Sequence, residues 1–441
     1  MIQPAARKTA ILINSPEIYF LNKADCQDFY IFTEKGTPLE AFAQKNFKKE
    51  KIITYSYNRS LKTKEPPSLT VDDLLDKTNI TKRLLENKID YFFIPYRSSK
   101  KAERWAKKHG LRPIVTPLSL QDKFENKRFF DDFLKANRII SPPSVTLKKI
   151  KNNRSYVIQE AKISDFFRTK FFKKGSELTD YCHQKKVPIQ KFVIREYLPG
   201  FSVGVSLFID RPGNYFFSAL RRQCFIYQHG FPKKFIGVQW LPTNFFQPSV
   251  IIKINRQLKK LAVALAKSGF FGVANVDLII YRQRPYILEC NPRLSMSMPQ
   301  AFSVSSLTAF SDSWRFFLNT FYQLKEYQTK QTRLPKSNFQ GAVLDIENKT
   351  KITIKKILPL GVYKAVGNQI IFVSGKLNDF NQKKDCFFLF HELEKGQVLG
   401  RGYSLCTIFS NSPLFDLAGG TLNSYGNQVY NYFSRAFILL R

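Results

Sequence analysis

The chain has 441 residues, of which 44% are hydrophobic, and 70 Lys and Arg against 34 Asp and Glu give it a net charge of +36. This length and this apolar fraction are typical of a globular protein of two or three domains and exclude a disordered chain. No apolar run approaches the roughly 20 residues that cross a bilayer, and the N-terminal run "AILI" is too short for a signal peptide, so we expect a cytoplasmic protein.

The charge and the cysteines narrow the class of protein further. The lysines are spread along the chain in short groups, which indicates a solvated basic surface. A phosphate-bearing substrate and a nucleic-acid partner are the alternatives, and we do not expect the nucleic acid. The six cysteines contain no CxxC pair, which argues against a structural zinc site and a disulfide framework and fits a reducing compartment.

The first 120 residues alternate short apolar runs with polar, helix-like runs. We expect strands within 9–15, 28–34, 51–57, 90–96 and 112–117, and amphipathic helices within 70–88 and 99–110, the second stopped by Gly110. Strands that alternate with helices predict a small α/β domain with a parallel sheet. No GxGxxG follows the first strand, so the dinucleotide-binding fingerprint is absent.

The middle of the chain is predicted to hold both helices and strands. The apolar positions from Phe124 to Leu134 fit one helix that ends before the paired prolines 142 and 143. Strands are expected at 155–160 and 191–210, around a helix at 175–186, and a long amphipathic helix at 249–270 leads into a hairpin. After about residue 335 the pattern becomes strand-rich. We therefore divide the chain into an N-terminal α/β domain (1–120), a central domain (121–334) and a β-rich C-terminal segment (335–441).

The hairpin "NVDLIIYRQRPYILECNPR" carries the most informative polar residues. Two apolar runs flank the short polar stretch "RQR", which predicts two strands and a tight turn. If the turn centres on Gln283, Asp277 lies opposite Glu289, and Asn275 lies opposite Asn291. Like charges across a ladder repel each other, so these carboxylates would persist where a cation sits between them.

The chemistry of these side chains favours magnesium. Two carboxylates and an amide oxygen form a hard-oxygen site, which suits Mg²⁺ rather than zinc. Arg293, just beyond this set, is placed to meet a phosphate or a carboxylate with its planar guanidinium. The alternative is a structural hairpin in which one carboxylate pairs with Arg282 or Arg284.

Several segments together resemble the ATP-grasp superfamily. "GFFGVANVDLII" followed by "PYILECNPR" is similar to the metal-binding hairpin of that family, which ends in Glu-x-Asn-Pro-Arg. Upstream, "ENKRFF" resembles the segment whose lysine contacts ATP, and "REYLPG" resembles the hinge strand Glu-x-x-x-Gly that holds adenine. The order of these segments is the order of the family, and it covers roughly residues 85 to 300. The resemblance implies an ATP-grasp fold with an N-terminal α/β pre-domain and a β-rich C-terminal cap.

The resemblance also implies roles for individual residues. The metal ligands would be Asp277, Glu289 and Asn291; the ATP-binding residues would be Lys127, Gln159, Arg195, Glu196, Leu198 and Ser202; the catalytic arginines would be Arg293 and Arg222.

Four features depart from the pattern or leave a choice open. Gln159 stands where the family usually has a second ATP lysine, and Ser202 stands where a second acid often meets the ribose. The lid, residues 161–172, contains no glycine, so Lys162, Arg168 or Lys170 would have to contact the phosphates. Between the adjacent arginines 221 and 222, we prefer Arg222 for the acyl phosphate.

The resemblance implies an ATP-dependent carboxylate–amine ligase. A carboxylate would attack the γ-phosphate, and an amine would then displace phosphate from the acyl phosphate, with ATP and Mg²⁺ (Mn²⁺ as an alternative) as cofactors. The partners would be a small-molecule carboxylate and an amine, and a homodimer stays open. Two other functions also stay open: a carboxylating or carbamoylating enzyme that uses bicarbonate, and a nucleotide-binding module that no longer catalyses.

Overall fold

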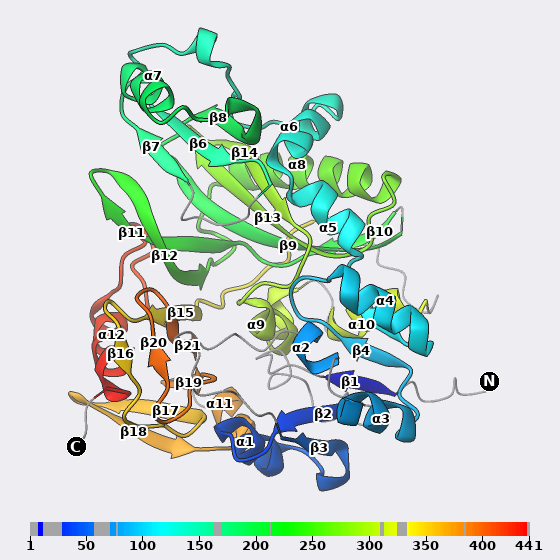
Figure 1. The fold of residues 1–441 in the computed structure, drawn as a ribbon. Helices are drawn as coiled ribbons and strands as arrows, with labels where there is room; N and C mark the ends of the chain where they lie inside the picture. The colour runs from blue at the N-terminus through cyan, green and yellow to red at the C-terminus, as the bar shows by residue number, and fades with distance from the viewer. Residues whose placement is uncertain are drawn as a thin grey trace.

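The computed structural model describes residues 8–11, 29–56, 71–75, 78–162, 169–211, 213–308, 313–323, 333–382 and 385–438. Its strands form a parallel sheet near the N-terminus, a small three-stranded sheet, a large antiparallel sheet and a two-stranded ribbon. Figure 1 shows the three-stranded sheet at the top, the N-terminal sheet at the lower right and the C-terminal strands at the lower left. Within these ranges, no helix is long and apolar enough to cross a membrane.

The N-terminal sheet has the order β3-β2-β1-β4-β5, and every pair in it is parallel. The strands are β1 (Thr9–Ile11), β2 (Phe29–Glu34), β3 (Ile52–Tyr55), β4 (Tyr91–Phe93) and β5 (Arg112–Ile114), and the helices are α1 (Pro38–Asn46), α2 (Val71–Leu75), α3 (Thr78–Glu86) and α4 (Lys100–His109). The predicted parallel sheet is therefore confirmed. Helix α4 begins at the Ser99 side-chain cap and ends at Gly110, whose φ of 68° is left-handed, as glycine allows. Helix α1 was not predicted, and two helices replace the one expected at 70–88.

Two helices also replace the single helix expected around Phe124–Leu134. Helix α5 (Leu118–Glu125) ends at Asn126, and the Asn126 side chain caps α6 (Lys127–Ala136) by accepting the N–H groups of Arg128 and Phe129. The apolar spacing continues across the break, so the sequence pattern could not reveal it. The break makes Lys127 the first residue of α6, where its backbone N–H donates to the Ala161 carbonyl at 2.8 Å.

The three-stranded sheet has the order β7-β6-β8 and carries helix α7. Its elements are β6 (Tyr156–Glu160), β7 (Lys170–Phe172), α7 (Gly175–Gln184) and β8 (Phe192–Glu196). The single strand expected at 191–210 is wrong, because β8 ends at Glu196 and β9 (Phe201–Arg211) belongs to the large sheet. Gly200 lies between them, and a Cβ there would come within 2.6 Å of the Ile280 carbonyl oxygen. The hinge thus passes too close to the neighbouring strand for any other residue.

The large sheet runs in the order β14-β13-β9-β11-β12-β15-β21-β19-β17-β18, and β10 pairs with β9. Its remaining strands are β10 (Asn214–Phe217), β11 (Arg221–Gln228), β12 (Phe231–Trp240), β13 (Gly272–Tyr281), β14 (Arg284–Asn291), β15 (Ala342–Glu347), β17 (Gly361–Val366), β18 (Gln369–Ser374), β19 (Cys386–Phe390) and β21 (Ser404–Ser410). The ribbon pairs β16 (Ile352–Thr353) with β20 (Val398–Leu399). The strands expected after residue 335 are confirmed, and β15 joins them to β12 in one continuous sheet.

The helices that follow the hinge cover this sheet. They are α8 (Pro248–Lys267), α9 (Met298–Ser303), α10 (Ser313–Tyr322), α11 (Leu377–Gln382) and α12 (Ser424–Ala436). Helix α8, predicted from its amphipathic pattern, buries Leu258, Leu261 and Leu265 in the same core as β9, β13 and β14. This packing fixes the hairpin that carries the predicted metal ligands. The five cysteines within the described ranges are buried and free.

Candidate functional site

The β13–β14 hairpin has the predicted pairing of polar residues. Asp277 lies opposite Glu289, and Asn275 lies opposite Asn291. Asn275 is not part of the carboxylate group, however. Its side-chain oxygen accepts hydrogen bonds from Ser206 Oγ at 2.8 Å and from Arg221 Nη2 at 2.9 Å, and its amide nitrogen donates to the Arg293 carbonyl.

The turn that produces this pairing differs from the expected one. The turn has two residues, Arg282 and Gln283, both with positive φ (48° and 58°), as in the tight turns that suit twisted hairpins. With this turn and no bulge, the register would shift by one residue and Asp277 would lie opposite Leu288. Leu288 has no partner on β13 and forms a bulge, which restores the alignment of Asp277 with Glu289.

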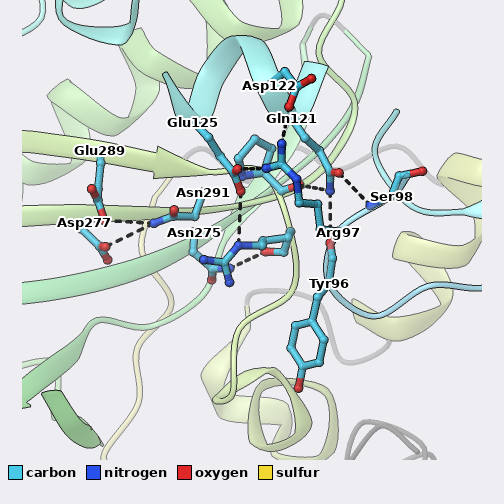
Figure 2. A network of polar contacts seen from close by, with 12 residues as sticks. Tyr96, Arg97, Ser98, Gln121, Asp122, Glu125, Asn275, Asp277, Glu289 and Asn291 are labelled. Atoms are coloured by element: carbon cyan, nitrogen blue, oxygen red, sulfur yellow. Dashed lines mark hydrogen bonds and ion pairs between the residues drawn. The ribbon is translucent and has the colours of Figure 1, made fainter. Parts of the chain in front are cut away.

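The two carboxylates have unequal electrostatic surroundings. Desolvation and the negative charge of Glu289 raise the pKa of Asp277 above its ordinary value. Desolvation also acts to raise the pKa of Glu289, but the Lys127 ammonium, 3.6 Å from Glu289 Oε2, and the Asn291 hydrogen bond bring this pKa below its ordinary value. The Asn291 amide nitrogen lies between the carboxylates, 3.4 Å from Asp277 Oδ2 and 3.2 Å from Glu289 Oε1 (Figure 2).

This donor set fits a divalent cation that prefers oxygen ligands. Burial and, after it, the negative charge of Glu289 raise the pKa of Asp277, and a cation between the two carboxylates would offset both effects. In the part of the chain that the structure describes, no group of three or more His, Cys, Asp or Glu side chains could hold a metal. Two carboxylates and an amide would provide part of a coordination sphere, and Mg²⁺ usually shares its other positions with water and substrate phosphates.

A cavity of about 530 Å³ opens beside the carboxylates and collects most of the predicted residues. The predicted residues that line it are Gln159, Arg195, Glu196, Leu198, Ser202, Asp277, Glu289, Asn291 and Arg293. Lys127 reaches this group through its ion pair with Glu289. The set thus comes from the three-stranded sheet, the hinge and the hairpin.

The hinge arginine holds the neutral Gln159 in place. Arg195 is buried, and its guanidinium binds both oxygens of Asp131, at 2.5 and 3.2 Å. The same guanidinium donates to Gln159 Oε1 at 3.2 Å. Gln159 is therefore held by a guanidinium whose charge is already paired with Asp131. Glu196 forms an ion pair with Arg154 at 2.5 Å.

The structure reverses our preference between the two adjacent arginines. Arg222 does not line the cavity: its guanidinium donates to the Leu417 carbonyl and lies 4.1 Å from the centre of the Phe201 ring. Arg221 lines the cavity instead, and burial lowers its pKa to about 10. Successive residues of a strand face opposite sides, so only one of the two could point inward, and packing on the C-terminal segment decided which.

Gln223 was not predicted and links two of the predicted residues. Its amide nitrogen donates to Asp277 Oδ1 at 2.8 Å, and its oxygen accepts the Ser202 hydroxyl. Ser202 is therefore linked to Asp277 through Gln223. The available signal was the position of Gln223, two residues after Arg221 and so on the same strand face.

Residues of the N-terminal part fix the loop that follows β14. Arg293 Nε lies 3.3 Å from Glu125 Oε1, and Glu125 also binds Arg97 (Figure 2). Gln121, fully buried, donates to the carbonyl oxygens of Tyr96 and Pro292 at 3.1 and 3.0 Å. These bonds tie the end of the hairpin to helix α5 and to the loop after β4.

The lid is described only in part. Arg168, with the rest of 163–168, lies outside the described residues. Lys170 lies over the Tyr181 ring of α7, 4.4 Å from its centre, whereas its neighbours Thr169 and Phe171 line the cavity. Lys162 is exposed. The Lys170 side chain therefore lies on α7 and not on the cavity side, where it would contact the phosphates as we predicted.

Comparison with known proteins identifies the architecture around this cavity. Residues 124–297 match the family model of the ATP-grasp domain. The protein has an ATP-grasp fold. The biotin carboxylase domain of 2-oxoglutarate carboxylase from Hydrogenobacter thermophilus, a dimer in complex with MgADP, ADP and bicarbonate, is similar with a TM-score of 0.63 and 11% identity, over 92% of this chain and 86% of that chain.

Two ligases have similar structures. The L-amino acid ligase from Bacillus licheniformis matches with a TM-score of 0.57 and 13% identity, over 98% of this chain and 96% of that chain. The phosphoribosylamine–glycine ligase from Thermotoga maritima matches with a TM-score of 0.55 and 12% identity, over 91% and 92%. No curated protein sequence matches the chain. The likeness thus lies in the fold, and it extends over carboxylases and ligases alike.

Proposed function

We propose that the protein is an ATP-dependent ligase that activates a carboxylate as an acyl phosphate for attack by an amine. One observation carries the proposal: Asp277 and Glu289 face each other across the hairpin and open into the same cavity as the hinge residues and two arginines. This cavity brings together groups for a metal, a nucleotide and an anion. No nucleophilic side chain is needed, because the substrate carboxylate itself attacks the γ-phosphate.

The residues of the chain act by position and charge. Asp277, Glu289 and Asn291 would hold Mg²⁺, which neutralises charge on the transferred phosphoryl group when bound. Hinge residues 195–198 would hold the adenine, and Lys127 would contact a phosphate. Arg221 and Arg293 would hold the carboxylate and the acyl phosphate. The carboxylate oxygen bonds to the γ-phosphorus as ADP leaves, and the amine nitrogen then bonds to the acyl carbon as phosphate leaves.

The proposal is tested by neutralising the two carboxylates in turn. Asp277→Asn and Glu289→Gln should each reduce substrate-dependent ADP release by at least about 100-fold. Loss of a residue that only supports a metal ligand typically reduces activity by up to about 100-fold, and loss of a ligand itself should cost at least as much. Asp132→Asn is the matched control, because Asp132 is an exposed carboxylate on α6 whose side chain is 72% exposed. Wild-type ADP release in both site variants, with a control that also behaves as wild type, would refute the metal assignment.

A bicarbonate-using enzyme is the second candidate, supported by the likeness to carboxylase domains over 92% of the chain. ADP release that depends on bicarbonate alone would favour it. A module that binds ATP without turnover is the remaining outcome of the same assay. The proposal also includes small-molecule rather than nucleic-acid partners, a cytoplasmic location, and domain limits at residues 120 and 334. Mn²⁺ in place of Mg²⁺ and a homodimer are its open alternatives.

A further inference from the structure

The cavity has two apolar regions, one at the hinge and the β13–β14 hairpin and one on the β11–β12 hairpin. One region surrounds the hinge and the hairpin and includes Val157, Leu198, Ile279 and Leu288. The other lies on the β11–β12 hairpin, which is separated from β13 and β14 by β9. A nucleotide held at the hinge would use the first region. The second region is therefore available to another part of the reaction.

The cavity-facing side of β11 and β12 changes from polar to apolar along its length. Arg221 and Gln223 lie at the base, where Gln223 donates to Asp277. Further along, Gln223 pairs with Val238, and Phe225 pairs with Phe235, whose rings meet edge to face at 5.7 Å. Among the described residues that line the cavity, none of those on β11 and β12 beyond Arg221 is charged.

The base of this surface has the properties of an anion site. Arg221 is 3% exposed, and its guanidinium donates to two neutral acceptors, Ser206 Oγ at 3.1 Å and Asn275 Oδ1 at 2.9 Å. Within the described part of the chain, no carboxylate lies within ion-pair distance of Arg221. A buried guanidinium with spare donors is stabilised by a carboxylate that binds to it.

The far end of the surface meets the three-stranded sheet. Phe231, near the tip of the β11–β12 hairpin, stacks on Phe171 of β7 at 5.4 Å and lies 5.0 Å from Tyr197 of the hinge. Phe171 and Tyr197 also line the cavity. A cluster of partly buried aromatic rings therefore lies at the apolar end.

We propose that the β11–β12 surface binds the apolar side chain of the carboxylic acid substrate, aliphatic or aromatic, while Arg221 binds its carboxylate. The proposal rests on the ligase function proposed above and names the substrate class. An acidic or phosphorylated side chain would be buried against Phe225 and Phe235 without a partner, which is unfavourable. Bicarbonate would leave the surface unused. The net charge of +36 thus says little about the substrate.

The experiment measures nucleotide binding and acid preference separately. Mg·ATP is first titrated into the full chain by calorimetry. ADP release is then measured with hydroxylamine as the amine and with phenylalanine, leucine, hexanoate, aspartate, glutamate or bicarbonate as the acid. We expect kcat/KM for the apolar acids to exceed that for aspartate and glutamate by at least 100-fold. If the protein binds ATP and uses aspartate or glutamate as well as or better than the apolar acids, or releases ADP with aspartate, glutamate or bicarbonate but with none of the apolar acids, the inference is overturned.

Variants of Phe235 test whether the β11–β12 surface sets the preference for apolar acids. Phe235→Ala should raise the KM for phenylalanine at least tenfold, with kcat within threefold and ATP affinity within twofold, and Phe235→Leu should recover most of the loss. Ile226→Ala is the control, because Ile226 is 43% exposed on β11 and does not line the cavity. A tenfold loss of ATP affinity in Phe235→Ala would assign this surface to the nucleotide and overturn the inference. Failure to bind Mg·ATP, or ADP release from no acid at all, would instead refute the proposed function.

Discussion

At the scale of single residues, the site depends on how each charge is neutralised. Lys127 is only 4% exposed, and its ammonium lies 3.6 Å from Glu289. A lysine held at the first turn of α6, with its backbone N–H on Ala161, has little freedom to turn to solvent. Its charge therefore acts on the group formed by the hairpin carboxylates and on any phosphate that binds there.

Removing this charge should weaken ATP binding. In Lys127→Ala the lost charge-assisted hydrogen bond is worth on the order of 1.5–3 kcal/mol, which is roughly a ten- to hundred-fold loss of affinity. Gln159→Ala should lose less, because the amide is neutral and the Arg195 guanidinium remains beside it. Calorimetric titration of Mg·ATP measures both changes.

A second lysine provides the control for this measurement. Lys123 lies over the rings of Phe124 and Phe129, 5.4 and 5.3 Å from their centres, and does not line the cavity. Lys123→Ala should leave ATP affinity unchanged within twofold. Unchanged affinity in Lys127→Ala would mean that Lys127 is not the nucleotide lysine.

At the scale of strands, three neighbouring strands bring Arg221 close to the Asp277–Glu289 pair. In the register of the large sheet, Asp277 of β13 lies beside Gly204 of β9, and Gly204 lies beside Arg221 of β11. A Cβ on residue 204 would lie 3.2 Å from Arg221 Nε and 3.3 Å from its Cζ and Nη2. Because Gly204 has no side chain, the Arg221 guanidinium can lie over β9, between its own strand and Asp277.

Adding one methyl group at this position should disturb turnover more than stability. Gly204→Ala would push the Arg221 guanidinium by a few tenths of an ångström, and we expect a loss of roughly tenfold or more in kcat, since small misplacements near a reacting group are costly. ATP affinity should stay within twofold. In the control Gly375→Ala, the new Cβ meets only the flexible Lys45 side chain, at 3.1 Å. Wild-type turnover in Gly204→Ala would contradict the role of this strand spacing.

The same strands show what the sequence could and could not predict. Apolar runs of four to eight residues located most strands. A turn centred on Gln283 predicted Asp277 opposite Glu289, and the two-residue turn of the structure reaches this pairing only with the bulge at Leu288. The break at Gly200 was missed because it depends on a distant group, the Ile280 carbonyl. The break at Asn126 is a local cap, and it was missed because the apolar spacing continues across it. The choice of Arg221 also depended on packing, since both arginines fit the alternation equally well.

At the scale of the whole molecule, the C-terminal segment is part of the same sheet as the site. Strand β15 pairs with β12, so residues beyond 335 support the apolar surface of the β11–β12 hairpin from the neighbouring strand. The strand-rich pattern and the family resemblance predicted a β-rich cap. They could not predict which strand the cap would join, because strand pairing is set by contacts between segments a hundred residues apart. The stability of the cap is therefore expected to affect the cavity.

A buried histidine makes the stability of this segment depend on pH. His391 is 3% exposed; its Nε2–H donates to the Leu358 carbonyl at 2.8 Å, and its Nδ1 accepts the Leu393 N–H at 3.2 Å. Both nitrogens are thus used in the neutral form. Burial lowers the pKa of His391 to about 4, below the roughly 6.5 of an unfolded histidine.

Protonation therefore favours the unfolded chain, and the contribution of neutral His391 is complete above about pH 6.5 and is lost as the pH falls toward 4. At pH 5 the loss is roughly 2 kcal/mol. In His391→Gln, where no titration occurs, urea unfolding at pH 7 and pH 5 should show a fall in the free energy of unfolding that is smaller than the wild-type fall by about this amount. His109→Gln is the control, because His109 lies on α4 and is not buried. Equal falls in wild type and His391→Gln would mean that His391 does not titrate on unfolding in this range.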